Sequence, residues 1–157
     1  MAYQYSIEVT ENCAKAVGVS LPISTKQSVM ICQALRRLPV PKAKKLLEEV
    51  IAKKKPIAFT RFNRNTGHKA GMAAGSFPVT ACFEILRLLK SAEANAQFKG
   101  LSTGNLKVRS AVAQRGPTTY HFGRQRTRAK RTHVELVLEE IKEKQEPAKI
   151  RRAEAKK

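Results

Sequence analysis

Hydrophobic and polar positions alternate near both ends of this chain. Over residues 3–10, apolar side chains alternate with polar ones, which is the period of a half-buried strand. The same period recurs over residues 106–113 and 134–139. These last two stretches predict the paired strands of a long antiparallel hairpin. The pattern therefore predicts a sheet of three strands.

Between the first strand and the hairpin, the apolar spacing changes to that of helices. Ser24 with Gln27 three residues later forms a capping-box pattern, which opens a helix over 24–38. A second helix, over 41–55, starts at a proline and carries a strong amphipathic pattern. The longest helix is expected over 78–100, where a glycine ends it.

These elements predict an α+β fold: three helices packed on a small three-stranded antiparallel sheet, with a long extended β-hairpin arm. We expect a single globular domain over 1–141. The arm within it is predicted to span 105–140, with its tip at 114–131. Residues 142–157 mix charges of both signs and have few apolar side chains, which predicts a charged C-terminal tail.

The charge of the chain indicates a polyanionic partner. The 157 residues include 31 Lys or Arg against 12 acids, a formal net charge of +19. Because 42% of the residues are hydrophobic, the chain can bury a core and is not a basic tail that never folds. Residues 105–133 contain basic side chains but no acid. A solvated surface usually carries both basic and acidic side chains. This stretch of one charge sign is therefore better explained by contact with phosphate than by solubility alone.

The tip of the predicted hairpin, 114–131, is the most informative segment for function. It has no acid and no Leu, Ile or Val, so it has no aliphatic side chain to bury against the core. Guanidinium groups suit bidentate phosphate contacts, and Arg124, Arg126 and Arg128 would project on one side of an extended strand. The rings at 120–122 offer flat faces for unstacked bases. A disordered basic loop is the alternative.

A second candidate site is the basic loop from Arg61 to Lys69. Glycine permits close approach of the backbone to phosphates, and Arg61, Arg64, His68 and Lys69 supply charge. The loop is not of the Walker type, because no glycine is followed by Lys-Ser or Lys-Thr at the required spacing. An ordinary turn-rich connection is the alternative.

Catalytic and metal-binding chemistry finds little support in the sequence. Glu48 and Glu49 lie on a Lys-rich helix, where salt bridges to Lys44, Lys45 and Lys53 are favoured over acid–base work. The three His residues have no Cys or His at metal-ligand spacing, and nothing singles out a Cys–His nucleophile. We therefore predict that the protein is not an enzyme and uses no cofactor or metal.

Cysteine usage and hydropathy bear on the cellular compartment. Cys13, Cys32 and Cys82 form no CxxC pair, and their odd number argues against a secreted disulfide framework. We expect each to be a small buried hydrophobe in a reducing cytoplasm. No apolar run approaches the ~20 residues that a membrane helix needs, and no signal-peptide pattern is visible. These features predict a cytoplasmic protein with no membrane partner.

Several short motifs occur together, and in this order, in one known family. They are Tyr5-Ser6, Gly67-His68-Lys69, Asn95-Ala96 with Lys99-Gly100, Arg115-Gly116-Pro117 and the run Thr132–Glu140. In these motifs the chain resembles the large-subunit ribosomal protein twenty-two family, and it looks most like the archaeal branch. The resemblance covers residues 3–140, which is nearly the whole chain.

The resemblance implies a structural constituent of the large ribosomal subunit, without an active site. It implies that the arm penetrates the large-subunit rRNA and lines the nascent-peptide exit tunnel. The implied partners are large-subunit rRNA, neighbouring large-subunit ribosomal proteins and the nascent polypeptide, with no small-molecule substrate. The alternative from another class is a free architectural or regulatory factor that binds DNA or RNA.

Charge and resemblance together predict one set of RNA-binding residues and one set at the arm tip. The predicted RNA-binding residues are Lys26, Arg61, Arg64, Asn65, His68, Lys69, Lys107, Arg109, Arg115, Tyr120, His121, Arg124, Arg126, Arg128, Lys130 and Arg131. The resemblance implies that the tunnel-facing residues of the tip are Thr118, Thr119, Tyr120, His121 and Phe122.

Overall fold

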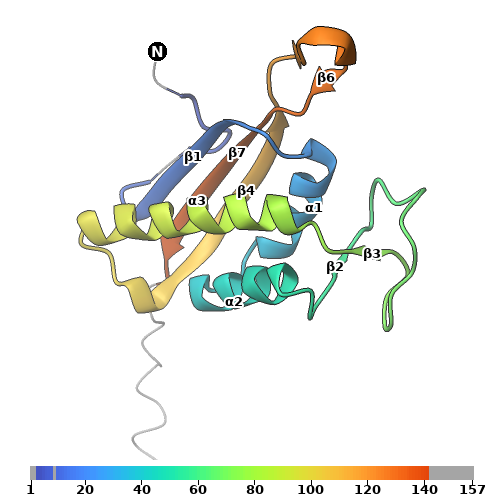
Figure 1. Ribbon diagram of the computed structural model, residues 1–157. Coiled ribbons are helices and arrows are strands. Elements are labelled where there is room, and N and C mark those ends of the chain that lie inside the picture. Colours follow the sequence, from blue (N-terminus) through green and yellow to red (C-terminus); the bar gives the residue numbers. More distant parts are fainter. Residues whose placement is uncertain (1–2, 9, 142–157) are drawn as a thin grey trace, which may run out of the picture.

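A computed structural model describes residues 3–8 and 10–141 (Figure 1). The predicted C-terminal tail, 142–157, lies outside the described residues. The elements, in chain order, are β1 (Cys13–Leu21), α1 (Thr25–Leu35), α2 (Val40–Ile51), β2 (Ile57–Ala58), β3 (Gly75–Ser76), α3 (Val79–Phe98), β4 (Leu106–Arg115), β5 (Thr119–Tyr120), β6 (Arg128–Ala129) and β7 (Thr132–Glu140). Short 3₁₀ turns occur at Thr103–Asn105 and Gly123–Gln125.

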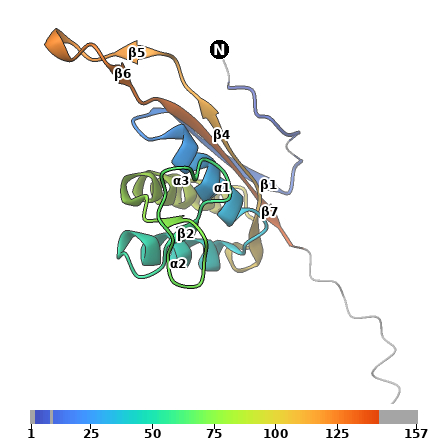
Figure 2. The same cartoon turned by 90° about the vertical axis from the view of Figure 1, so that its right-hand side faces the viewer.

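The main sheet has the order β1-β7-β4, and both of its strand pairs are antiparallel. All three helices lie against the same face of this sheet (Figure 2). Strands β2 and β3 pair in a separate small ribbon, and β5 pairs with β6 in the arm. The predicted α+β fold with three helices, a three-stranded antiparallel sheet and a hairpin arm is confirmed.

The core lies between the sheet and the helices. On the central strand β7, Val134, Leu136 and Leu138 are fully buried and belong to the same apolar cluster as Ile85 and Leu89 of α3. Because side chains alternate along a strand, the residues between them face the other side of the sheet. That second face is where Glu135 lies.

The strand predicted over residues 3–10 is wrong, because the first strand is β1 at Cys13–Leu21. In β1 the fully buried positions are Cys13 and Ala14, whose small side chains produce only a weak hydropathy alternation. The segment at 3–8 instead lies on the sheet face opposite the helices (Figure 2), where Tyr3 and Ser6 hydrogen-bond to Glu135.

The predicted helices exist, but some of their ends differ from expectation. Ser24 is the N-cap of α1, yet its side chain makes no capping hydrogen bond, so the predicted capping box is wrong. Its carbonyl oxygen instead accepts a hydrogen bond from the Ser28 hydroxyl at 2.9 Å. At the other end of the helical region, Gly100 adopts φ +75° just after α3, which confirms it as the stop of the longest helix.

Candidate nucleic-acid interface

The neck of the arm is the place where its two strands leave the main sheet. The Gly116 amide donates to the Arg131 carbonyl oxygen at 2.9 Å, and a Cβ on Gly116 would lie 3.0 Å from the Arg131 backbone carbon. A side chain here would press on the Arg131 backbone, so glycine favours this close approach of the two strands. Below the neck, the Thr132 hydroxyl donates to the Ile23 carbonyl oxygen at 2.8 Å, and this bond ties the arm to the start of α1.

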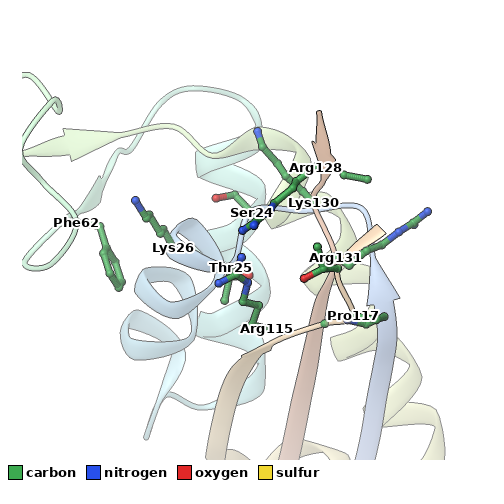
Figure 3. Close-up of a pocket in the computed structure, with 12 residues that line it drawn as sticks. Ser24, Thr25, Lys26, Phe62, Arg115, Pro117, Arg128, Lys130 and Arg131 are labelled. Carbon is green, nitrogen blue, oxygen red and sulfur yellow. The ribbon is translucent and has the colours of Figure 1, made fainter. Parts of the chain in front are cut away.

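A groove of about 630 Å³ lies between the start of α1 and the neck of the arm (Figure 3). Its lining includes many basic side chains and no acid. The lining residues are Ser24, Thr25, Lys26, Phe62, Arg115, Gly116, Pro117, Thr118, Arg128, Ala129, Lys130 and Arg131. The walls come from α1, the basic loop and both sides of the arm, so the fold brings together segments that are far apart in sequence.

Cations of this groove differ from the basic side chains on the main sheet. Lys107 and Arg109 approach Glu139 at 3.3 and 3.7 Å, so this acid partly neutralises them. Over residues 3–8 and 10–141, no ion pair involves a cation of the groove. Arg131 donates to the Ser20 carbonyl oxygen at 3.3 Å, which fixes its orientation but leaves its charge. The groove therefore presents uncompensated positive charge.

Of the predicted RNA-binding residues, the structure gathers five in the groove. They are Lys26, Arg115, Arg128, Lys130 and Arg131. The sequence interpretation missed Phe62, Ser24 and Thr25, which also line the groove. Phe62 lies inside the predicted basic loop, beside Arg61, and an exposed aromatic between basic residues was the available signal.

The basic loop places its predicted residues on a surface near α1, away from the arm tip. Arg61, Arg64, Asn65, His68 and Lys69 are all exposed there. A second hollow of about 380 Å³ lies in this loop, lined by Asn65, Thr66, Gly67, Lys69, Gly75, Ser76 and Phe77. A Cβ on the buried Gly75 would lie 2.6 Å from the Met72 sulfur, so the loop closes tightly on itself.

The arm tip projects beyond the helices and the sheet, and its side chains are exposed (Figures 1 and 2). Phe122 is 95% exposed and Tyr120 is 62% exposed, so neither ring packs on the domain. The expectation that Arg124, Arg126 and Arg128 lie along one extended strand is wrong. Gly123–Gln125 forms a 3₁₀ turn that begins at Gly123 with φ +69°, and it interrupts the alternation.

The structure also bears on the alternatives of catalysis and metal binding. Cys13, Cys32 and Cys82 are free and buried as expected, and burial raises the pKa of the Cys32 and Cys82 thiols to about 12. Such thiols are protonated and inert near neutral pH.

The salt bridges predicted for Glu48 and Glu49 do not form among the described residues. Lys44, one of the predicted partners, pairs instead with Glu93 of α3.

Two absences apply only to the part of the chain that the structure describes. There, three or more His, Cys, Asp or Glu side chains nowhere cluster closely enough to hold a metal ion. No helix in that part has the length and apolar character needed to cross a membrane.

Comparison with known proteins decides the family. Residues 16–139 match the family described as Ribosomal protein L22p/L17e. The chain belongs to this family. Its members are structural ribosomal proteins and not enzymes, which confirms the predicted family and the prediction of no enzymatic activity.

Individual archaeal members of the L22p/L17e family are similar over most of their length. The large ribosomal subunit protein uL22 of Methanosphaera stadtmanae is 41% identical over 147 residues, which cover 88% of this chain and 96% of that protein. The protein of the same name from Methanocaldococcus jannaschii is 37% identical, with 87% and 94% covered. That of Archaeoglobus fulgidus is 39% identical, with 87% and 94% covered. These similarities confirm the predicted likeness to the archaeal branch of the family.

Proposed function

We propose that this L22p/L17e chain is a structural constituent of the large ribosomal subunit that binds large-subunit rRNA. The observation that carries the proposal is the acid-free groove at the neck of the arm, together with the exposed basic tip beyond it. Uncompensated Lys and Arg side chains displace counterions from RNA phosphates, which favours binding without any catalytic step. The names of the similar archaeal proteins, each a large ribosomal subunit protein, support the assignment.

The arm adds a second part to the proposal. Its exposed tip, 114–131, is proposed to pass between rRNA segments and to line the nascent-peptide exit tunnel. Almost all side chains of residues 117–130 are exposed, and none forms a hydrogen bond within the described part of the chain. The rings at 120–122 are therefore open to an RNA or peptide surface. Neighbouring large-subunit proteins and the nascent polypeptide are the further partners in this arrangement.

The salt dependence of rRNA binding tests the proposal. The triple variant Arg115→Gln, Arg128→Gln and Lys130→Gln should reduce the slope of log K against log salt by about two to three, because each lost phosphate contact removes ~0.7–0.9. The matched control replaces Lys53, Lys54 and Lys55 by Gln, which removes the same charge away from the groove. We expect the control to retain most of the wild-type slope.

Two outcomes would contradict the proposal, one from this salt titration and one from a high-salt wash of large subunits. Equal slopes for both triple variants would show that net charge, and not the groove, sets the affinity. A wild-type chain that washes off large subunits in high salt would instead indicate the alternative, a free architectural or regulatory nucleic-acid-binding factor. A ribosomal constituent co-sediments with the subunit through that wash.

A further inference from the structure

One wall of the groove has a feature that charge does not explain. Phe62 lines the groove with a 46% exposed ring, and its backbone has φ +58°. The left-handed region is a genuine outlier for a bulky side chain. Strained residues persist where the surrounding structure holds them, and they cluster at ligand clamps and similar functional sites. Phe62 combines this unusual backbone conformation with a half-exposed ring.

Two cations flank the Phe62 ring at the rim of the groove. The Lys26 ammonium lies 5.8 Å from the ring centroid, and the guanidinium carbon of Arg61 lies 5.5 Å from it. In Figure 3, Lys26 lies between Phe62 and the start of α1. Both cations are within the range of a cation–π interaction, so they hold the ring beside the basic lining.

This pairing of an apolar ring with cations matches the two halves of a nucleotide. A base stacks on an aromatic face, and its phosphate binds Lys or Arg. The remaining basic residues of the groove lie on the arm side, opposite Phe62 (Figure 3). A regular duplex keeps its base faces inside the stack, so only an unpaired base can offer its face to this ring.

We propose that the groove binds one unpaired nucleotide of an RNA strand, with the base stacked on Phe62 and the phosphates held by the groove cations. This inference rests on the proposed RNA binding and goes beyond it by naming the kind of RNA element that the groove selects. Phe62 thereby sets specificity, whereas Lys26, Arg115 and Arg128 provide affinity for the backbone.

Three RNA hairpins test this inference with the full chain. The probes share one stem, which is fully paired in the first, carries one bulged adenosine in the second, and carries an abasic bulge in the third. Fluorescence anisotropy should show that the wild-type chain binds the bulged adenosine about tenfold more tightly than either other probe, as expected for one base stacked on an aromatic ring. Phe62→Leu should abolish this preference and leave binding of the paired stem unchanged.

Two further variants separate stacking from a general structural effect. Phe62→Tyr keeps a flat ring and should retain the preference. Phe98→Leu changes another exposed ring, 93% exposed at the end of α3, and should behave as wild type. Circular dichroism and urea unfolding confirm that each variant is folded.

The possible results distinguish failure of this inference from failure of the proposed function. Equal binding of the three probes by the wild-type chain would overturn the inference and leave general RNA binding intact. A preference that survives Phe62→Leu, or a loss that is equal on paired and bulged stems, would also overturn it. Failure of the wild-type chain to bind any of the probes would overturn the proposed function as well.

Discussion

The two halves of one hairpin differ sharply in how their polar groups are satisfied. At the base, Glu135 on β7 is only 3% exposed and is the only buried charged side chain among the described residues. It accepts hydrogen bonds from the Tyr3 hydroxyl at 2.7 Å, the Ser6 amide at 2.9 Å and the Gln114 side chain at 3.0 Å. At the tip, no side chain of residues 117–130 forms a hydrogen bond within the described structure.

The difference shows which half is complete within this chain. The base encloses a carboxylate and supplies every donor that it needs, so it belongs to the folded domain. The tip leaves its guanidinium, hydroxyl and ring groups exposed, so its polar groups are available to a partner. One continuous hairpin therefore has a domain-stabilising end and a binding end, and Gly116 at the neck lies between them.

Replacing Glu135 should have the largest effect on stability. Glu135→Ala removes a shared acceptor from a buried position and leaves its donors on Tyr3, Ser6 and Gln114 without that partner, which should lower the free energy of unfolding by about 3 kcal/mol. Urea unfolding followed by circular dichroism measures this. Glu84→Ala on α3 is the control and should stay within about 0.5 kcal/mol of wild type. Equal effects of the two substitutions would mean that the Glu135 network does not stabilise the base.

A smaller effect is expected at Tyr3, and it should depend on pH. Burial, and then the hydrogen bond to Glu135, raises the pKa of Tyr3 from 10.0 to about 12. The neutral phenol is therefore the form that the fold favours. Its stabilising contribution is complete below pH 10 and is lost as the pH rises through about 12.

Tyr3→Phe isolates this contribution, because other titrating groups are common to both proteins. We expect a loss of about 1 kcal/mol at neutral pH, since Tyr3 is only partly buried. The difference in unfolding free energy between wild type and variant should shrink between pH 10 and pH 12. A difference that stays constant across this range would show that the phenol proton is not involved.

The sequence could predict the elements whose pattern is local, but not the contacts between residues far apart in the chain. Strands β4 and β7 and the three helices were predictable because their apolar periods are local. Glu135 carries no local signal of burial, since it occupies a polar position of an alternating strand and is covered by residues 129 and 132 positions away. The alternation over residues 3–10 wrongly predicted a strand, because it carries no local signal of the distant partner. Tyr3 and Tyr5 pack on a surface far away in sequence and do not pair in a β-ladder.

The candidate groove was predictable only in part. Four of its five cations, all except Lys26, follow from the acid-free stretch, because charge composition is visible along the chain. Phe62 and Thr25 join them only through folding, which brings the basic loop and the start of α1 beside the neck of the arm. The extended run expected for Arg124, Arg126 and Arg128 fails because Gly123 permits a positive φ and a tight turn.

The smallest effect on stability should come from removing the tip itself. Replacing residues 118–127 by a short glycine turn deletes side chains that bury almost no surface, so the free energy of unfolding should change by less than about 0.5 kcal/mol. Binding to large-subunit rRNA should nevertheless weaken. A Gly/Ser segment of the original length is the matched control, because it keeps the reach of the arm and removes only its side chains. A tip deletion that unfolds as readily as Glu135→Ala would show that the tip stabilises the domain, and the contrast between the two ends of the hairpin would fail.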